Sequence, residues 1–437
     1  MSNVISLLMI QPENHEINRF RRLQFNNFTQ LTMPYLAAFV DERYYKITLI
    51  DEYRQRIPYG TRFDLAAITV STPNAPHCYE ISARLRGAGT RVVMGGPHAT
   101  LLPGEVMPHC DHLIVGEAED IWPRFLDDFR NGSALDIYRQ DAPSELAGLP
   151  IARRDLLKRS RIMKSAVIAT RGCPYNCHYC NLKQIYHHRF RTRPVGEVAG
   201  EIRTLPSKFF VFWDDNLFAD KKYAKELLRT LAPLKRRWAA QATLRDCADE
   251  ELLELAKSAG CVYLFVGLES FSEKSLGDAG KGVNRTADYA PVINAIHRHG
   301  IMIQAGIIFG FDSDTPAVFD ETLKACESLG IDGATVSMLT PFPGTPIYNQ
   351  LKAAGRLTAG ERIIVEGRHA SPDWSKYNSK TSIAFVPLNM SADELWNGYN
   401  RFRRRFYSFG SFIRRMRVSK TNVIINFIIN LGYRFGV

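Results

Sequence analysis

The stretch 171–180 reads Arg-Gly-Cys-Pro-Tyr-Asn-Cys-His-Tyr-Cys, and its three cysteines are Cys173, Cys177 and Cys180. The glycine and proline in it favour a loop over a helix or strand. Three thiolates on one loop can surround a single metal centre, and thiolates favour zinc or an iron–sulfur cluster. Structural zinc takes four ligands, and His178, between two of the cysteines, is expected to point elsewhere. The stretch therefore favours an iron–sulfur cluster with one open iron, with a structural zinc loop as the alternative.

The surrounding sequence alternates strand and helix patterns. The short apolar runs that predict strands are 166–170, 209–212, 239–243, 262–266, 302–309 and 334–339. Three of the helix patterns between them end at Gly260, Gly300 and Gly330, and glycine tolerates the left-handed conformation that ends a helix. Six such units over 165–345 predict a partial (β/α)6 barrel of the TIM type.

Polar residues follow these strands at the barrel rim, where βα folds collect their ligand chemistry. The cysteine stretch follows the first strand, and the rim candidates after the second, third and fourth strands are Asp214, Asp215, Arg245 and Glu269. Solvated charges at strand ends are the alternative role for these four side chains.

The first 135 residues show an earlier strand–helix alternation, which predicts a Rossmann-like parallel α/β domain. Small or polar turn residues follow three of its strands, where a backbone can approach a large ligand. They are Ser71, Thr72, Gly95, Gly96, Pro97, His98, Gly116 and Glu117. The turn-rich segment 136–164 is predicted to be a linker.

The cysteine pattern, Cys-x3-Cys-x-aromatic-Cys with Tyr179 at the aromatic position, resembles the radical S-adenosylmethionine (radical SAM) superfamily over about 165–345. The resemblance implies a 4Fe-4S cluster whose open iron binds S-adenosylmethionine. An electron from a donor such as flavodoxin or ferredoxin would then produce a 5′-deoxyadenosyl radical. The superfamily often has Gly-Gly-Glu after the second strand, where it holds the methionyl amine. This chain has Asp214 and Asp215 at that point, and the resemblance implies the same role for them. The resemblance assigns Glu269 to the ribose or sulfonium, and Arg245 to the methionyl carboxylate or the substrate.

The runs Val-Met-Gly-Gly-Pro-His-Ala and Ile-Val-Gly-Glu-Ala-Glu resemble the cobalamin-binding domain of class B radical SAM methylases. The Asp-x-His-x-x-Gly motif of other cobalamin proteins is absent. Cobalamin bound without that histidine is therefore implied, with His98 either a ligand or a packing residue. A domain that no longer binds the corrin is the alternative.

Together these resemblances imply a methyltransferase acting on an unactivated carbon of a small molecule or lipid. A radical rearrangement, cyclisation or other bond formation, and a non-catalytic sensor, stay as alternatives. An RNA-modifying methylthiotransferase is disfavoured, because that family has a second cysteine trio and only Cys78 and Cys110 precede the cluster stretch.

The net charge of +11 comes largely from one C-terminal segment without acidic residues. Its basic residues are Arg401, Arg403, Arg404, Arg405, Arg414, Arg415, Arg417 and Lys420. The remainder is nearly balanced, so no nucleic-acid partner is expected. Residues 346–437 are predicted to be mostly helical. The aromatic stripe in 392–409 favours packing over the open barrel.

The apolar run 423–431 is too short to span a bilayer. With the basic segment before it, the run suggests a peripheral membrane contact. This tail resembles that of hopanoid methylases, which favours a lipid or membrane-associated substrate. The cysteines outside the stretch are scattered and no signal peptide is evident, so a cytoplasmic setting is expected.

Overall fold

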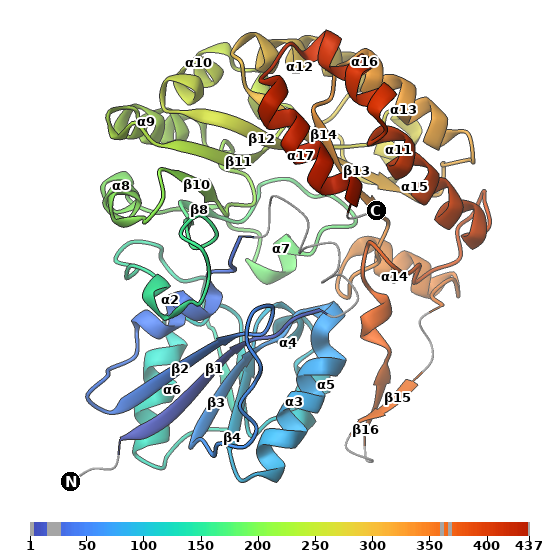
Figure 1. Cartoon of the computed structure of the whole chain (residues 1–437). Coiled ribbons are helices and arrows are strands. Elements are labelled where there is room, and N and C mark those ends of the chain that lie inside the picture. The colour runs from blue at the N-terminus through green and yellow to red at the C-terminus, as the bar shows by residue number, and fades with distance from the viewer. Residues whose placement is uncertain (1–3, 15–27, 359–361, 366–368, 436–437) are drawn as a thin grey trace.

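The computed structural model describes residues 4–14, 28–358, 362–365 and 369–435. In Figure 1 two parallel sheets lie one above the other, each with its own helices. The strands of the lower, N-terminal sheet are β1 (Ile5–Gln11), β2 (Tyr45–Asp51), β3 (Leu65–Thr69), β4 (Arg91–Gly95), β5 (His112–Val115) and β6 (Ile137–Arg139). Its helices are α2 (Thr32–Ala38), α3 (Ala75–Gly87), α4 (Pro97–Leu101), α5 (Pro103–Val106) and α6 (Ile121–Arg130).

The N-terminal sheet has the order β2-β1-β3-β4-β5-β6 and is buried on both faces. Successive residues of β3 show why, since Ala66 and Ile68 join the core under α3 while Leu65 and Ala67 join the core under α2 and α6. Side chains of a strand alternate between its two faces, so an uninterrupted apolar run suits a sheet covered twice. Strand β6 pairs with β5 and lies inside the segment 136–164.

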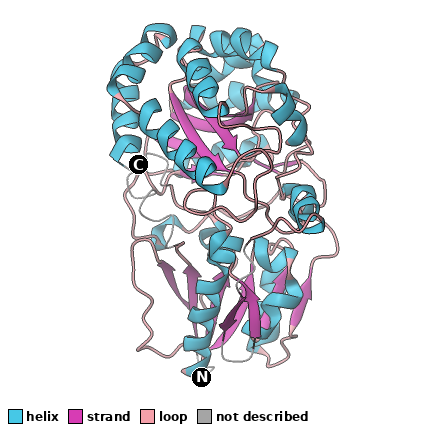
Figure 2. Ribbon diagram, turned by 90° about the vertical axis from the view of Figure 1, so that its right-hand side faces the viewer, coloured by secondary structure: helices cyan, strands magenta, loops and turns pink. Residues whose placement is uncertain are grey.

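The upper sheet is also parallel, in the order β14-β13-β12-β11-β10-β7, with helices around its outer face (Figure 2). Its strands are β7 (Ala166–Val167), β10 (Phe209–Phe212), β11 (Arg237–Thr243), β12 (Cys261–Glu269), β13 (Met302–Phe309) and β14 (Gly333–Met338). Its helices are α8 (Val195–Thr204), α9 (Lys221–Leu231), α10 (Glu250–Ser258), α11 (Glu273–Asp278), α12 (Tyr289–Arg298) and α13 (Val318–Ser328). The predicted fold class, a Rossmann-like domain followed by a six-stranded partial barrel and a helical end, is confirmed.

The C-terminal region covers the open side of the barrel and also returns to the first domain. It contains α14 (Pro346–Ala353), the antiparallel pair β15 (Arg362–Val365) and β16 (His369–Pro372), α15 (Ala392–Phe406), α16 (Phe409–Ser419) and α17 (Val423–Phe435). Trp374 lies in the core of the first domain, where its indole N–H donates to Glu105 at 2.7 Å. No helix in the described part of the chain is long and apolar enough to cross a membrane.

The edge strand β14 is capped by side chains of this region. The Tyr407 hydroxyl donates to the carbonyl of Ala334 at 2.6 Å and accepts from the Ala334 N–H at 3.1 Å. The aromatic stripe predicted to pack over the barrel does so, because its members are buried apart from the half-exposed Trp396. The buried members are Leu395, Tyr399, Phe402 and Phe406.

Candidate active site

The cysteine loop connects the short antiparallel strands β8 (Thr170–Arg171) and β9 (Arg191–Thr192), and it contains α7 (Leu182–Ile185). Its first turn needs glycine, because Gly172 has a φ of +90° and a Cβ there would collide with the Arg189 carbonyl oxygen. His178 points away from the thiols, since its Nδ1 is 3.1 Å from the Asp278 carbonyl oxygen. The three cysteines of the loop are therefore available as metal ligands, whereas His178 is turned towards Asp278.

The three thiols are half-buried neighbours. Burial raises the pKa of each thiol, that of Cys180 to about 12, and the nearby Cys177 and Cys173 raise it further. Among the described residues no three or more Cys, His, Asp or Glu side chains converge closely enough to hold a single metal ion. Thiolates that are disfavoured on their own are stabilised by coordination to a cation, so the loop suits a cluster bound by three sulfurs.

Asp214 holds the start of this loop. Its carboxylate is fully buried and accepts from the Ala169 N–H at 3.1 Å and the Thr170 hydroxyl at 2.6 Å, and also from the Thr170 N–H. Burial nevertheless raises the pKa of Asp214 to about 7. The carboxylate is therefore occupied by the backbone that leads into the cysteines.

Asp215 takes a different position. It is half-buried, accepts from the Gly172 N–H at 3.0 Å and lines a cavity of about 460 Å³. Burial raises the pKa of Asp215. Both adjacent carboxylates therefore bond to the backbone at the start of the loop, and Asp215 also faces the cavity.

The cavity lies between the two domains, at the carboxyl ends of the N-terminal strands. Residues of the first domain on its wall include Gly95, Gly96, Pro97, Gly116 and Glu117. Residues from the barrel side include Arg171, Tyr186, Trp213, Asp215 and Gln241. Apolar walls with a few polar groups are typical of a cofactor pocket. The cavity therefore offers a binding site between the first domain and the cysteine loop.

His98 does not reach this cavity. It is fully buried, with Nδ1 3.2 Å from the Thr72 hydroxyl and Nε2 3.5 Å from Glu105. Thr72 and Ser71 likewise belong to the turn before α3 and are not on the cavity wall. No histidine occurs among the described residues that line the cavity.

Glu117 joins the two domains at the cavity wall. Its carboxylate pairs with Arg171, just before the cysteines, at 2.5 Å, and with Arg191 of β9 at 2.7 Å. Burial opposes the charged form, but the bonds from Arg191 and Arg171 hold the pKa of Glu117 below its ordinary value. Arg171 also pairs with Glu119 at 2.6 Å. The cysteine loop is thus tied to the turn after β5.

Glu269 ends β12 in an unusual conformation, with a φ of +65°. Its carboxylate pairs with Lys281 at 2.9 Å, and both side chains are buried. Gly267 makes room for this pair, because a Cβ there would collide with the Glu269 carboxylate. A strained non-glycine residue at a strand end is a frequent mark of a functional site.

Lys281 extends this pair towards the cysteines. Its ammonium is 3.5 Å from the Tyr179 hydroxyl. Burial works against its charge, but Glu269 and the thiols of Cys177 and Cys173 hold the pKa of Lys281 above its ordinary value. A buried cation therefore lies beside the predicted cluster, where it can offset the negative charge of thiolates or of a bound carboxylate.

Arg245 is exposed and lies apart from the cavity, on a surface hollow with residues of α12. Sequence reasoning missed three cavity or cluster neighbours, Trp213, Tyr186 and Lys281. Trp213 follows β10 at the rim, so the expectation that ligand-binding residues follow strand ends could have included it. Lys281 is 12 residues beyond Glu269, and nothing in the sequence signals that the two side chains meet.

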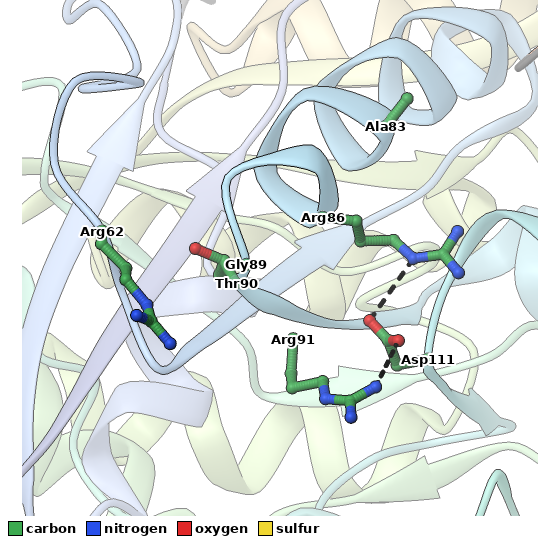
Figure 3. A pocket seen from close by; sticks show the side chains of 7 residues that line it. All are labelled: Arg62, Ala83, Arg86, Gly89, Thr90, Arg91 and Asp111. Carbon is green, nitrogen blue, oxygen red and sulfur yellow. Dashed lines mark hydrogen bonds and ion pairs between the residues drawn. The ribbon is translucent and has the colours of Figure 1, made fainter.

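A second hollow, shown in Figure 3, lies at the opposite end of the N-terminal sheet. Arg91, the first residue of β4, and Arg86 both approach Asp111 there, at 3.1 and 3.5 Å. Ligands of parallel α/β sheets bind at the carboxyl ends of strands, and this hollow is at the amino end. It is not a candidate for the active site.

Two family models match the chain. The model of the radical SAM superfamily matches residues 167–326, and that of the B12 binding domain matches residues 28–126. These ranges contain the cysteine loop and the strand ends of the first domain that line the cavity.

Similar proteins include a methyltransferase and a methylase. The bacteriochlorophyllide d C-12(1)-methyltransferase of Chlorobaculum tepidum is 30% identical over 90% of this chain and 87% of its own length. The hopanoid C-2 methylase of Rhodopseudomonas palustris is 26% identical over 64% of this chain and 55% of its own length. Among solved structures, the radical S-adenosylmethionine methyltransferase TsrM from Kitasatospora setae, with cobalamin and a 4Fe-4S cluster bound, superimposes with a TM-score of 0.69. At 16% identity it covers 92% of this chain and 88% of its own, so it supports the fold.

Proposed function

Since the chain belongs to the cobalamin-dependent radical SAM methyltransferase family, with a B12-binding domain before its barrel, we propose that it methylates an unactivated carbon of a hydrophobic small molecule or lipid. Its cofactors are a 4Fe-4S cluster, S-adenosylmethionine and cobalamin. The observation that carries the proposal is the cavity whose walls combine the B12 domain with the cysteine loop. When bound, the cluster supplies the electron that splits S-adenosylmethionine, and cobalamin supplies the methyl group.

The cluster belongs on Cys173, Cys177 and Cys180, which share one loop. Tyr179 and the Lys281–Glu269 pair lie next to these thiols and offer a hydroxyl, a cation and a carboxylate. In the proposal Lys281 faces the carboxylate of the methionyl group, and Glu269 accepts from a hydroxyl or ammonium of the same nucleotide. Asp214 acts indirectly, because it holds the backbone at Ala169 and Thr170.

Cobalamin belongs in the interdomain cavity, against Gly95–Gly96 and Gly116. Glycine at 96 keeps the turn close to β3, because a Cβ there would lie 2.8 Å from the Thr69 hydroxyl. Because His98 is buried against Thr72, we propose that the corrin binds without His98 as a ligand. Asp215 and Trp213 face it from the barrel side.

The relatives limit the substrate class. One acts on bacteriochlorophyllide d and another is a hopanoid methylase, and both names denote large apolar molecules. We place the substrate of this chain in the same chemical class. A reduced flavodoxin or ferredoxin is the electron donor in this proposal.

Anaerobic purification followed by cluster reconstitution tests the proposal. The protein should show iron–sulfur absorbance and release a corrinoid, and with dithionite it should convert S-adenosylmethionine to 5′-deoxyadenosine. Cys177→Ala should abolish that conversion, whereas Cys247→Ala, in the apolar core, should retain it.

Methyl transfer needs its own measurement. S-adenosylmethionine with a deuterated methyl group should add the mass of that methyl group to a chlorophyllide or hopanoid acceptor. A product of unchanged carbon count would replace methylation by a rearrangement or cyclisation. Iron-loaded protein without corrinoid would remove the cobalamin step.

A further inference from the structure

Helix α17 buries two asparagines beside Ile429 and Tyr433 and exposes most of its other apolar residues to solvent. The inward residues Asn426 and Asn430 are buried, and Asn426 donates to the Asp332 carboxylate at 2.8 Å. Asn430 donates to the Asp332 carbonyl at 2.9 Å and accepts from Arg415 at 2.9 Å. These bonds fix the rotation of the helix about its axis. A surface helix ordinarily exposes its polar residues and buries its apolar ones, so buried asparagines on a helix with an exposed apolar stripe are unusual.

The outward face of α17 forms one apolar stripe. Its members are Val423, Ile424, Phe427, Ile428 and Leu431, with exposed fractions between 39 and 73%. At 100° per residue these positions form one continuous arc of the helix, which faces away from the buried side that holds Ile429, Asn430 and Tyr433. Because Asp332 and Arg415 hold the asparagines inside, the stripe cannot rotate into the core.

Helix α16 continues this surface. Phe409 and Ile413 are exposed, and the ring of Phe409 lies 6.3 Å from that of Phe427 on α17. Figure 1 shows α16 and α17 side by side on the outside of the barrel, in red. We name the seven residues Phe409, Ile413, Val423, Ile424, Phe427, Ile428 and Leu431 the apolar face. Contiguous exposed apolar surface of this kind marks an interaction site.

Cations surround the apolar face. Arg417 follows Ile413 by one helical turn, Lys420 ends α16, and Arg434 lies on the same side of α17 as Phe427. Two other basic residues of the segment are neutralised, Arg405 by Asp320 and Arg414 by Glu327. Within the described residues no ion pair is formed by Arg417 or Lys420, and the sequence from 401 to 437 contains no acid.

This charge pattern selects among possible partners. A second copy of the chain would bring the two cationic rims together without an acid to neutralise them. An anionic bilayer offers an apolar layer that can bury the stripe and lipid phosphates that can pair with the surrounding cations. We propose that the apolar face binds the surface of a membrane containing anionic lipid, with α16 and α17 lying along it. The short length of α17 restricts this contact to the interface.

Vesicle flotation of the full-length protein tests the proposal. Wild-type protein should float with phosphatidylcholine–phosphatidylglycerol vesicles, should stay behind with phosphatidylcholine alone, and should bind less as salt is added. Ile428→Asp should weaken binding by at least about tenfold, since it places a charge in the apolar stripe. Leu388→Asp is the matched control, because Leu388 is equally exposed but lies outside the apolar face.

A charge variant addresses the rim separately. Arg417→Gln with Lys420→Gln should weaken binding to the anionic vesicles by about tenfold or more, from roughly 1 kcal/mol per cation. The paired control, Arg203→Gln with Lys222→Gln, removes two exposed cations of α8 and α9 and should leave binding unchanged. Thermal melting and 5′-deoxyadenosine formation should match wild type in every variant, which separates this test from that of the proposed function.

Three results would overturn the proposal. The first is wild-type protein that binds neither vesicle, or an Ile428→Asp variant that floats as wild type does. The second is a concentration-dependent dimer in sedimentation equilibrium that Ile428→Asp abolishes, because a second copy would then cover the face. The third is competition for the face by an acidic protein such as flavodoxin while vesicles do not bind.

Discussion

Arg171 Nη1 lies 2.5 Å from Oε1 of Glu117, so the residue just before the cysteine loop is bonded to the turn after β5 of the other domain. Both side chains are nearly buried, with 12 and 4% of their surface exposed. This pair couples the geometry of the cofactor cavity to that of the predicted cluster, because both residues line the cavity. A displacement of either domain would break it.

Glu117→Gln should lower the free energy of unfolding by about 3–5 kcal/mol, because it leaves Arg171 and Arg191 with uncompensated buried charge. Denaturant titration at neutral pH measures the change. Arg91→Gln, which removes one exposed partner of Asp111, should cost no more than about 1 kcal/mol. Equal losses in the free energy of unfolding for the two variants would show that the interdomain pair stabilises the protein no more than an exposed ion pair does.

The same pair has a pH signature. Bonds from the arginines hold the pKa of Glu117 below its ordinary value despite burial. A depressed carboxyl pKa stabilises the folded protein above the pKa of the unfolded chain, and this contribution is lost as the pH falls through the folded value. The stability difference between wild type and Glu117→Gln should therefore be constant near pH 7 and shrink below about pH 4. A difference that grows on acidification would contradict this assignment.

Lys281→Met should destabilise the protein by about 3–5 kcal/mol, because the buried Glu269 carboxylate loses its partner. The double variant Lys281→Met/Glu269→Gln should recover most of that loss, since no buried charge is then unpaired. Denaturant titration of the four proteins gives the coupling energy. Cleavage of S-adenosylmethionine should stay impaired in the double variant, and full recovery of cleavage would limit the pair to a structural role.

Gly172→Ala should disrupt the cysteine loop. The added Cβ would collide with the Arg189 carbonyl oxygen, and the φ of +90° is unfavourable for alanine. We expect a loss of about 1–3 kcal/mol in stability and a lower iron content after reconstitution. Gly87→Ala is the matched control, because Gly87 ends α3 with open space around it. Normal iron content in Gly172→Ala would show that the loop adapts.

Lys380→Met tests a lysine beside the edge strand. Its ammonium donates to the Ser337 hydroxyl at 3.1 Å, and burial, with Arg403 nearby, lowers the pKa of Lys380 to about 7. Between this value and the unfolded pKa near 10.4 the unfolded chain binds more protons, so this lysine makes stability rise with pH. Unfolding measured at pH 7 and 9.5 should show that rise reduced in Lys380→Met and retained in Lys222→Met, an exposed control. Identical slopes would contradict the assignment.

Much of the fold follows from local patterns. The predicted strands 209–212 and 302–309 match β10 and β13, and the helices before Gly260, Gly300 and Gly330 end as expected, with positive φ at each glycine. These features depend on neighbouring residues, which a sequence displays directly. Strand β6 was missed because three residues with exposed ends carry little apolar signal.

The site was less accessible to sequence reasoning. The strand-end rule found Asp215 and Glu269, but it could not separate Asp215, on the cavity wall, from Asp214, held by the backbone of β8. It also could not exclude Arg245 from the cavity. Which rim residue turns inward depends on packing between distant segments, and the pairing of Glu117 with Arg171 depends on how two domains meet.

Tyr407 has a practical consequence for anyone who wishes to express the catalytic half alone. Its hydroxyl satisfies both backbone groups of Ala334 on the outermost strand of the barrel. A fragment that stopped near residue 345 would keep all six strands but leave these backbone groups of the edge strand β14 unpaired. Unpaired edge strands can pair with other chains, which leads to aggregation. Soluble fragments should therefore extend past Tyr407, well beyond the last strand of the barrel.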